Sequence, residues 1–212
     1  MLTRTIARRA ALAGVAGAAV LALAACGGGD HSSDSGHGMP GAGATTGAAS
    51  ASAAAGFDDD DVMFAQMMIP HHQQAVQMSE LADGRAQDPE VKKLAAEIKA
   101  AQAPEIATMT GWLNAWGRPV PSGSPDTGGH MDHGGMSGMM SDADMAKLKA
   151  ASGTEFDRQF VTMMIAHHEG AITMAKQEIA NGANAEAKAM AQQIVTAQQG
   201  EIDAMNKILA RL

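Results

Sequence analysis

The sequence has little cysteine, few aromatic residues and none of the common catalytic motifs. Of its 212 residues, one is cysteine, none is tyrosine and two are tryptophan. A single cysteine excludes an intrachain disulfide and a thiolate metal site, and so few aromatic residues form no platform for sugars or bases. The chain has no Glu-x-x-His pair of the di-iron bundles, no glycine-rich phosphate loop, no zinc-protease helix and no serine nucleophile elbow. We therefore expect no enzymatic activity.

The first 25 residues have the composition of a signal peptide. Arg4, Arg8 and Arg9 form a basic segment, and the apolar stretch at 10–25 is short for a transmembrane span. The sequence "LAAC", which ends at Cys26, resembles the lipobox at which bacterial lipoproteins are cleaved and lipidated. The alternative is an ordinary signal peptide with an incidental cysteine. We predict an exported protein that is lipid-anchored at Cys26 to the outer face of the bacterial cell membrane.

Residues 26–56 carry the predicted lipid anchor and a tether. Gly, Ala, Ser and Thr dominate this segment, which has too few large apolar side chains to offset the chain entropy lost on folding. Without the three arginines of the signal peptide, 12 Lys and Arg face 23 Asp and Glu, a net charge near −11. This charge argues against a nucleic-acid partner and against attachment to the membrane by charge, so we expect the lipid alone to hold the protein there.

The rest of the chain, 57–212, contains an internal duplication. The stretch "MMIPHHQQAVQM" from Met67 returns as "MMIAHHEGAITM" from Met163, and the flanking residues also align at a shift of 96 positions without a gap. We therefore expect an approximate twofold axis between the two halves. The duplication defines three segments: repeat one (57–116), a linker (117–153) and repeat two (154–212).

Each repeat is predicted to form two helices. Residues that favour helices dominate, and no alternating β-branched run occurs. In the first helix, Phe64, His71, Ala75 and Met78 share one face at the helical period. Two such hairpins make an all-α four-helix bundle, joined by a long Gly/Pro-rich connection that we predict to be mobile. Pro70 lies inside the first helix, where it should kink the helix or weaken a turn.

The two copies of the motif resemble the signature of a known family. "FAQMMIPHHQQAVQMSELA" and "FVTMMIAHHEGAITMAKQEI" are similar to the pattern F-x-x-x-M-I-x-H-H-x-x-A-x-x-M-A of the secreted ferritin-like family known as domain of unknown function 305. The only departure is Ser79, which replaces the final Ala in the first copy. The resemblance covers roughly residues 57 to 212. It implies an exported, ferritin-like four-helix bundle, and members of the family are linked to copper binding and copper tolerance.

The repeated His and Met residues predict a site for a soft metal ion. Thioether sulfur and imidazole nitrogen together favour Cu(I) over Zn(II), Mg(II) or Ca(II). A Met stripe at helical spacing is more often core packing, and an inward-facing His is more often structural, so that alternative stays open. The linker adds a second group of His and Met. The candidate metal ligands are His71, His72, His167, His168, Met67, Met68, Met78, Met163, Met164 and Met174 in the repeats, and His130, Met131, His133, Met136, Met139 and Met140 in the linker.

Glu105 and Glu201 occupy equivalent positions on the apolar faces of the second helices. Each is a candidate to accept a hydrogen bond from His71 or His167 and so orient it, to join a metal site directly, or to extend into water. We expect His71 and His167 to face the interior, and the two histidines that follow them, His72 and His168, to lie nearer its edge.

The sequence thus favours an extracytoplasmic lipoprotein that binds copper, as Cu(I), for sequestration or for transfer to a copper-handling partner. One alternative is an envelope interaction or structural module that binds no metal and whose His pairs are structural. A redox-active metalloprotein is a third hypothesis.

Overall fold

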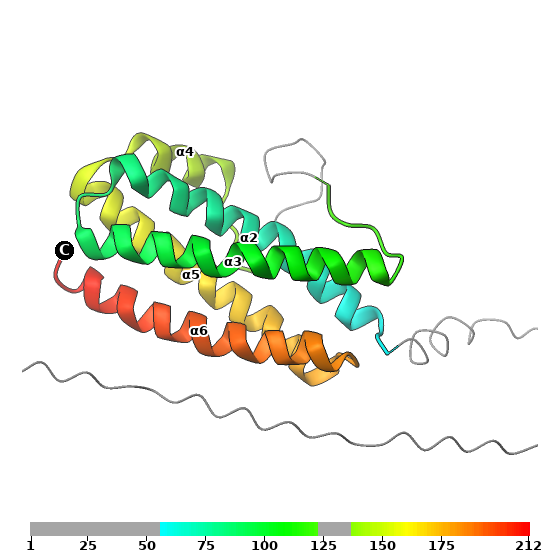
Figure 1. Cartoon of the computed structure of the whole chain (residues 1–212). Coiled ribbons are helices and arrows are strands. Elements are labelled where there is room, and N and C mark those ends of the chain that lie inside the picture. Colours follow the sequence, from blue (N-terminus) through cyan, green and yellow to red (C-terminus); the bar gives the residue numbers. More distant parts are fainter. Residues whose placement is uncertain (1–55, 123–136) are drawn as a thin grey trace, which may run out of the picture. The chain divides into compact units, whose positions relative to one another are not determined.

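The computed structural model describes residues 56–122 and 137–212, and over these residues it is entirely helical. Two antiparallel hairpins and one short helix make up the described fold (Figure 1). The predicted all-α bundle of two hairpins is therefore confirmed. The first hairpin consists of α2 (Asp59–Arg85) and α3 (Pro89–Ala115), the second of α5 (Gly153–Asn181) and α6 (Ala185–Leu209), and α4 (Asp142–Ala150) lies between them.

The helix α4 begins within the connection 117–144 that the sequence predicts to be mobile, so that prediction is wrong for residues 142–144. The Ser141 side chain caps the helix at its first turn, and Leu148 is fully buried. The cap and the buried leucine together fix a segment whose Gly-rich neighbourhood gives little sign of a helix.

Polar caps fix where the long helices begin. Asp88 and Asn184, which are equivalent in the two repeats, each accept two backbone hydrogen bonds from the first turn of α3 and α6. Such caps are worth about 1 kcal/mol each. Pro70 and Pro104 lie inside α2 and α3, and both helices continue through them.

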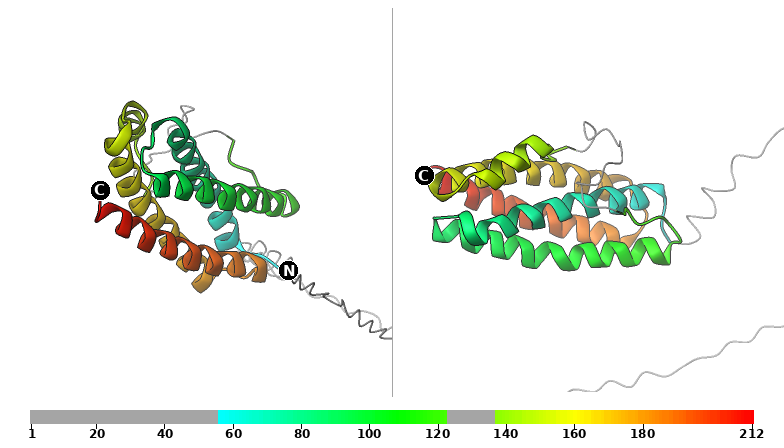
Figure 2. Two further views of the ribbon diagram at one scale, coloured as in Figure 1. Left: turned by 60° about the vertical axis from the view of Figure 1, so that its left-hand side comes forward. Right: turned by 90° about the horizontal axis from the view of Figure 1, so that it is seen from above.

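The hairpins pack on each other mainly through their first helices, α2 and α5, whereas α3 and α6 touch little (Figure 2). Two buried carboxylates join the hairpins. Asp61 of α2 accepts from the backbone amide of Asn184 at 2.9 Å, and Asp157 of α5 accepts from that of Asp88 at 2.9 Å. Asp61 is equivalent to Asp157 and Asp88 to Asn184, so the two contacts are reciprocal. This is the arrangement expected of an approximate twofold axis. We call these two contacts the Asp61 latch and the Asp157 latch.

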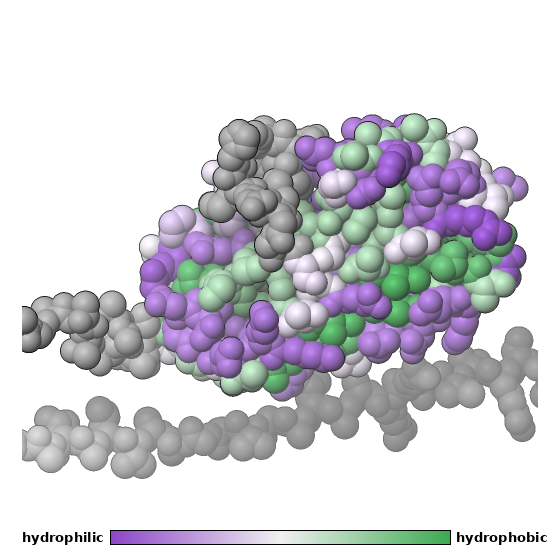
Figure 3. Space-filling view, turned by 180° about the vertical axis from the view of Figure 1, so that it is seen from behind, coloured by the Kyte–Doolittle hydropathy of each residue, from purple (hydrophilic) through white to green (hydrophobic). Residues whose placement is uncertain are grey.

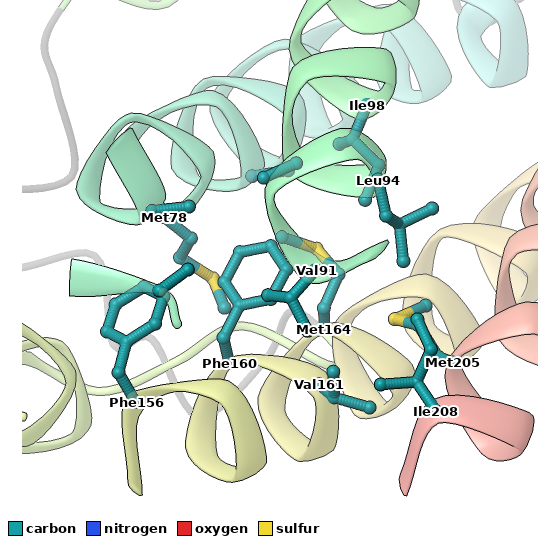
Figure 4. Close-up of a cluster of buried hydrophobic side chains, with 14 of the residues drawn as sticks. Met78, Val91, Leu94, Ile98, Phe156, Phe160, Val161, Met164, Met205 and Ile208 are labelled. Atoms are coloured by element: carbon teal, nitrogen blue, oxygen red, sulfur yellow. The ribbon is translucent and has the colours of Figure 1, made fainter. Parts of the chain in front are cut away.

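The apolar core is divided into two clusters by a polar layer. Along α2, one cluster ends at Ile69 and the other begins at Ala75, with histidines between them. The cluster that begins at Ala75 is shown in Figure 4 and includes Met78, Phe156, Phe160, Met164 and Leu148. The cluster that ends at Ile69 includes Phe64, Met68, Met109, Met174 and Ile194.

The surface seen from behind has a broken band of hydrophobic residues between hydrophilic margins (Figure 3). Within the described residues, Met63 is the one large hydrophobic side chain that is exposed, at 51% of its area. The helices of the described part include none that is long and apolar enough to span a bilayer.

Candidate metal centre

The four histidines of the repeated motif lie buried together where α2 packs on α5. Each is 0% exposed. The rings of His71 and His167 are 3.7 Å apart between centroids, with their planes inclined by 38°. The prediction that this pair faces the interior is confirmed. His72 and His168, the outer histidines of the motif, are buried as completely as the central pair, and each contacts a partly exposed glutamate.

Each outer histidine is hydrogen-bonded to the glutamate of its own hairpin. Nε2 of His72 lies 2.8 Å from Oε2 of Glu105, and Nε2 of His168 lies 2.7 Å from Oε2 of Glu201. Of the three roles expected for these glutamates, a hydrogen bond to His71 or His167 is therefore wrong. The second helix of each hairpin packs along its own first helix, and this packing brings the glutamate to the outer histidine.

The glutamate contact also determines which nitrogen of the outer histidine is free. An ionised carboxylate only accepts hydrogen bonds, so the proton of a neutral ring belongs on Nε2 and the lone pair on Nδ1. Nδ1 of both His72 and His168 is buried and has no hydrogen-bond partner in the part of the chain that the structure describes. A histidine held by a carboxylate through one nitrogen, with the other nitrogen free, is the usual arrangement of a metal-binding histidine.

The polar layer contains further buried atoms that have no hydrogen-bond partner within residues 56–122 and 137–212. They include both ring nitrogens of His71 and of His167, and amide atoms of Gln102 and Gln198. An unpartnered buried polar group costs about 1–3 kcal/mol, so this layer is expensive as it stands. Sequence reasoning did not assign the two glutamines to the site. The signal was present, since they are equivalent polar residues on the inward face of α3 and α6.

Burial keeps the central imidazoles neutral. Burial, followed by the nearby charge of His72, lowers the pKa of His71 to about 3. Burial, followed by the charge of His71, lowers the pKa of His167 well below its ordinary value. Neutral imidazole is the form that binds metals, so protons compete little for this pair at neutral pH.

Distance along the helices separates the predicted thioether ligands into two groups. A rise of 1.5 Å per residue places a residue four positions before a histidine about 6 Å away along the axis, and one seven positions after it about 10 Å away. All six are buried or half-buried and lie in or against the apolar clusters, so packing does not separate the two groups, and only the near group is within about one helical turn of a histidine (Figure 4). The near group comprises Met67, Met68, Met163 and Met164, and the far group comprises Met78 and Met174.

The histidines do not form a metal site with carboxylates alone. Over the residues that the structure describes, no three His, Cys, Asp or Glu side chains are placed to hold one metal ion. An ion in the polar layer would therefore need a donor of another kind beside two imidazoles. The near group of thioethers supplies such donors, and this donor set is typical of Cu(I) sites rather than Zn(II) sites.

The end of the linker is held against both repeats beside the histidines. The Gln74 side chain donates to the backbone carbonyl of Met140 at 2.8 Å and accepts from its amide at 2.7 Å. Gly170 is equivalent to Gln74, and a Cβ on Gly170 would overlap the backbone of Ser137. Gln74 and Gly170 each lie three residues after a central histidine, and both contact the same linker segment, residues 137–140. Of the linker ligand candidates, Met139 and Met140 are half-buried, and His130, Met131, His133 and Met136 lie outside the described residues.

Comparison with known proteins assigns the family. The model of the family named "domain of unknown function (DUF305)" matches residues 61–209. The chain belongs to the DUF305 family. The resemblance found in the doubled motif is therefore confirmed. Among curated proteins, none matches the chain significantly.

Solved structures of DUF305 proteins have the same fold. One from Streptomyces coelicolor is 37% identical, with the match covering 72% of this chain and 93% of that one at a TM-score of 0.64. A DUF305 fragment from Deinococcus radiodurans is 34% identical, covering 73% and 98% of the two chains at a TM-score of 0.65. CopM in its Cu(II)-bound form is 37% identical, covering 71% and 96% at a TM-score of 0.61, and CopM has also been solved in Cu(I)-bound and Ag-bound forms.

Proposed function

We propose that this protein binds Cu(I) in the polar layer at the centre of the bundle and sequesters or transfers copper outside the cytoplasm, without catalysing a reaction. His71 and His167 are the proposed nitrogen ligands, and the near group of methionines is the proposed source of sulfur. The observation that carries the proposal is the set of buried imidazole nitrogens that have no hydrogen-bond partner among the described residues. A metal ion would use their lone pairs.

The charge of the layer also favours a small cation. Glu105 and Glu201 are 24% and 20% exposed, and each touches an outer histidine. A buried cation is unfavourable unless opposite charge lies close by, and these two carboxylates supply that charge from both sides of the approximate axis. A bound ion would be cargo that the protein holds or passes to a partner. The histidines and methionines of the layer would hold it and keep water away from it.

Similarity to CopM supports the choice of metal. CopM has been solved with Cu(I), Cu(II) and silver, and Ag(I) shares the preference of Cu(I) for soft donors. Because the sulfur donors here are thioethers and the nitrogen donors are neutral, we expect Cu(I) to bind more tightly than Zn(II) at pH 7. A competition titration that gives the opposite order would contradict the proposed site.

The central test compares two double variants of the same layer. His71→Leu/His167→Leu should stay helical and melt cooperatively, but bind at least one Cu(I) fewer than the parent. The matched control Gln102→Leu/Gln198→Leu removes buried polar atoms from the same layer and should keep the parent stoichiometry. In a third variant, His130, Met131, His133 and Met136 are replaced by Ser, which isolates the bundle from the linker.

The same experiment tests the rival hypothesis of structural histidines. If the double His variant binds as many ions as the parent, with the same affinity, the bundle histidines are structural. Replacing a purely structural pair by Leu removes unpartnered polar groups, so it should raise stability.

We also propose that the protein acts at the outer face of the membrane, anchored through Cys26. The support is the signal-like N-terminus, together with the Streptomyces coelicolor relative, whose description is that of a secreted protein. Cys26→Ser should leave the protein unprocessed or release it from the membrane fraction. Unchanged partitioning into detergent would contradict the lipid anchor.

A further inference from the structure

A pocket of about 310 Å³ lies away from the histidines, between the first half of α2 and the last half of α5. Three of its lining residues are methionines, namely Met63, Met67 and Met174, and Glu178 lines it beside them. Met63 and Met67 are four residues apart on α2, and Met174 and Glu178 are four residues apart on α5. Residues at that spacing lie side by side on one face of a helix. Two such pairs therefore line the pocket together from the two helices.

Two of these methionines, Met63 and Met67, are more exposed than core packing requires. Met63 is 51% exposed and Met67 is half-buried. A side chain with half of its surface in water contributes little to the core, so packing alone does not account for a methionine at 63. The equivalent position in the second repeat is Gln159, so the duplication does not demand a thioether there either.

The acidic lining of the pocket favours a cation over an anion. Asp60 is exposed, and Glu178 is 2% exposed, with neither of its own carboxyl oxygens accepting a hydrogen bond from a described donor. Burial raises the pKa of Glu178 to about 8, so at pH 7 it offers mostly neutral oxygen, and the attraction for a cation comes from Asp60. None of the described residues that line the pocket is basic. Thioethers beside acidic groups, without Cys or His, match a soft monovalent cation and disfavour Zn(II) or Ca(II).

We infer that Met63, Met67 and Met174 form a second binding site for a soft monovalent metal ion, Cu(I) or Ag(I), separate from the histidine layer. The inference shares the metal class and Met67 with the proposed function, whereas Met63 and Met174 belong to the pocket alone. Variants at Met63 and Met174 therefore distinguish a failure of the pocket site from a failure of the histidine layer. A partly exposed site suits loading and release of the ion, since the ion reaches it without crossing the core. The histidine layer would hold its ion out of contact with water.

The test follows the methionine methyl groups of the full-length protein by NMR, with Ag(I) as a probe that does not change oxidation state. The methyl signals of Met63, Met67 and Met174 should shift together within one equivalent of Ag(I). They should do so both in the parent and in His71→Leu/His167→Leu. The double variant Met63→Leu/Met174→Leu, which leaves the near group of methionines intact, should bind one Ag(I) fewer. The triple variant that adds Met67→Leu should bind at least one fewer.

A matched control uses the other flank of the bundle. Met163 and Met78 are equivalent to Met67 and Met174, and the double variant Met163→Leu/Met78→Leu should bind Ag(I) at the open pocket as the parent does. Met63→Leu alone changes an exposed residue and cannot unfold the bundle, yet it should weaken binding at the pocket at least tenfold. The inference is overturned if the three methyl signals shift at different Ag(I) equivalents, or if Met63→Leu and the folded triple variant bind like the parent.

Discussion

The flank of the bundle that α4 covers and the flank with the open pocket are built from equivalent positions of the two repeats. On the covered flank, Leu148 of α4 is fully buried in one cluster with Phe156 and Phe160 (Figure 4). On the open flank, the position equivalent to Phe156 is Asp60, and an exposed Met63 stands in the place of Gln159. The two flanks therefore differ in character because a few equivalent positions carry different residues: one flank is apolar and covered, and the other is open and acidic.

The central layer shows the opposite behaviour. His71 matches His167, and each outer histidine bonds its glutamate at nearly the same distance in the two hairpins. The repeats therefore differ at the flanks and agree at the layer between the core clusters. Core packing explains the shared apolar positions, but it does not explain why an unpartnered polar layer is present in both halves. A shared ligand at the axis would explain that agreement.

The largest predicted effect concerns the covered flank. Leu148→Ala should lower the free energy of unfolding by about 3 kcal/mol, because removing a fully buried leucine side chain leaves a cavity. Met63→Ala on the open flank should change it by less than about 0.5 kcal/mol, as surface substitutions do. Urea unfolding followed by circular dichroism measures both. Equal losses would mean that α4 does not close the flank in solution.

A smaller effect concerns Glu178, whose equivalent on the covered flank is Ala82. Burial, followed by the Asp61 carboxylate, raises the pKa of Glu178 to about 8. Between pH 4.5 and 8 the folded protein keeps a proton that the unfolded chain has lost, so stability falls as pH rises through that range. At about 1.4 kcal/mol per pKa unit the full change would be about 5 kcal/mol, but water in the pocket that Glu178 lines screens its charge. We therefore expect Glu178→Gln to stabilise the protein by about 2 kcal/mol at pH 8.

The gain from Glu178→Gln should vanish at pH 4, where the carboxyl group is protonated in both the folded and the unfolded protein. Thermal melts at several pH values give the profile. The exposed Glu186→Gln, at the same end of the bundle, is the control and should show no such dependence. A gain that is constant from pH 4 to pH 8 would contradict the raised pKa.

The two latches provide a further comparison. Asp157→Ala should cost about 2 kcal/mol, because backbone amides lose a charged acceptor, and the cost should be similar at pH 7 and at pH 9. Asp61→Ala should cost less at pH 9 than at pH 7. Above pH 8 the parent holds the Asp61 and Glu178 charges together, and removing Asp61 relieves that repulsion. Denaturant unfolding at the two pH values tests this, and an equal pH response of the two variants would contradict it.

The fold was largely predictable, because its determinants are local and repeated. Helical periodicity, the turn before Pro89 and the shift of 96 positions define both hairpins and their approximate symmetry. The axis in turn predicts reciprocal contacts between equivalent residues, and the latches at Asp61 and Asp157 have that arrangement. Neither latch was predicted as a contact, since a carboxylate on one hairpin does not reveal which distant loop it will meet.

The details of the site depended on packing that the sequence does not encode locally. A position on a helical face shows that Glu105 points inward, but the rotation of α3 against α2 decides that it meets His72 and not His71. The contact of Gln74 with Met140 joins residues 66 positions apart. It depends on where a Gly-rich linker returns to the bundle, which periodicity does not predict. The burial of all four histidines likewise follows from the crossing of α2 and α5.

The smallest predicted difference is between the two glutamates of the central layer, and it tests whether the layer is one site. Glu105→Gln and Glu201→Gln each keep an oxygen that accepts from the outer histidine but remove one negative charge. Losing such a carboxylate commonly weakens metal binding 10- to 100-fold, so each variant should weaken Ag(I) binding at least about tenfold. The two values should agree within about threefold, because His72 and His168 lie at equivalent places about the axis. Titration in the background with serine at 130, 131, 133 and 136 excludes the linker. Weakening by one variant alone would show that the ion sits within one hairpin, and the agreement between the repeats would then need a structural explanation.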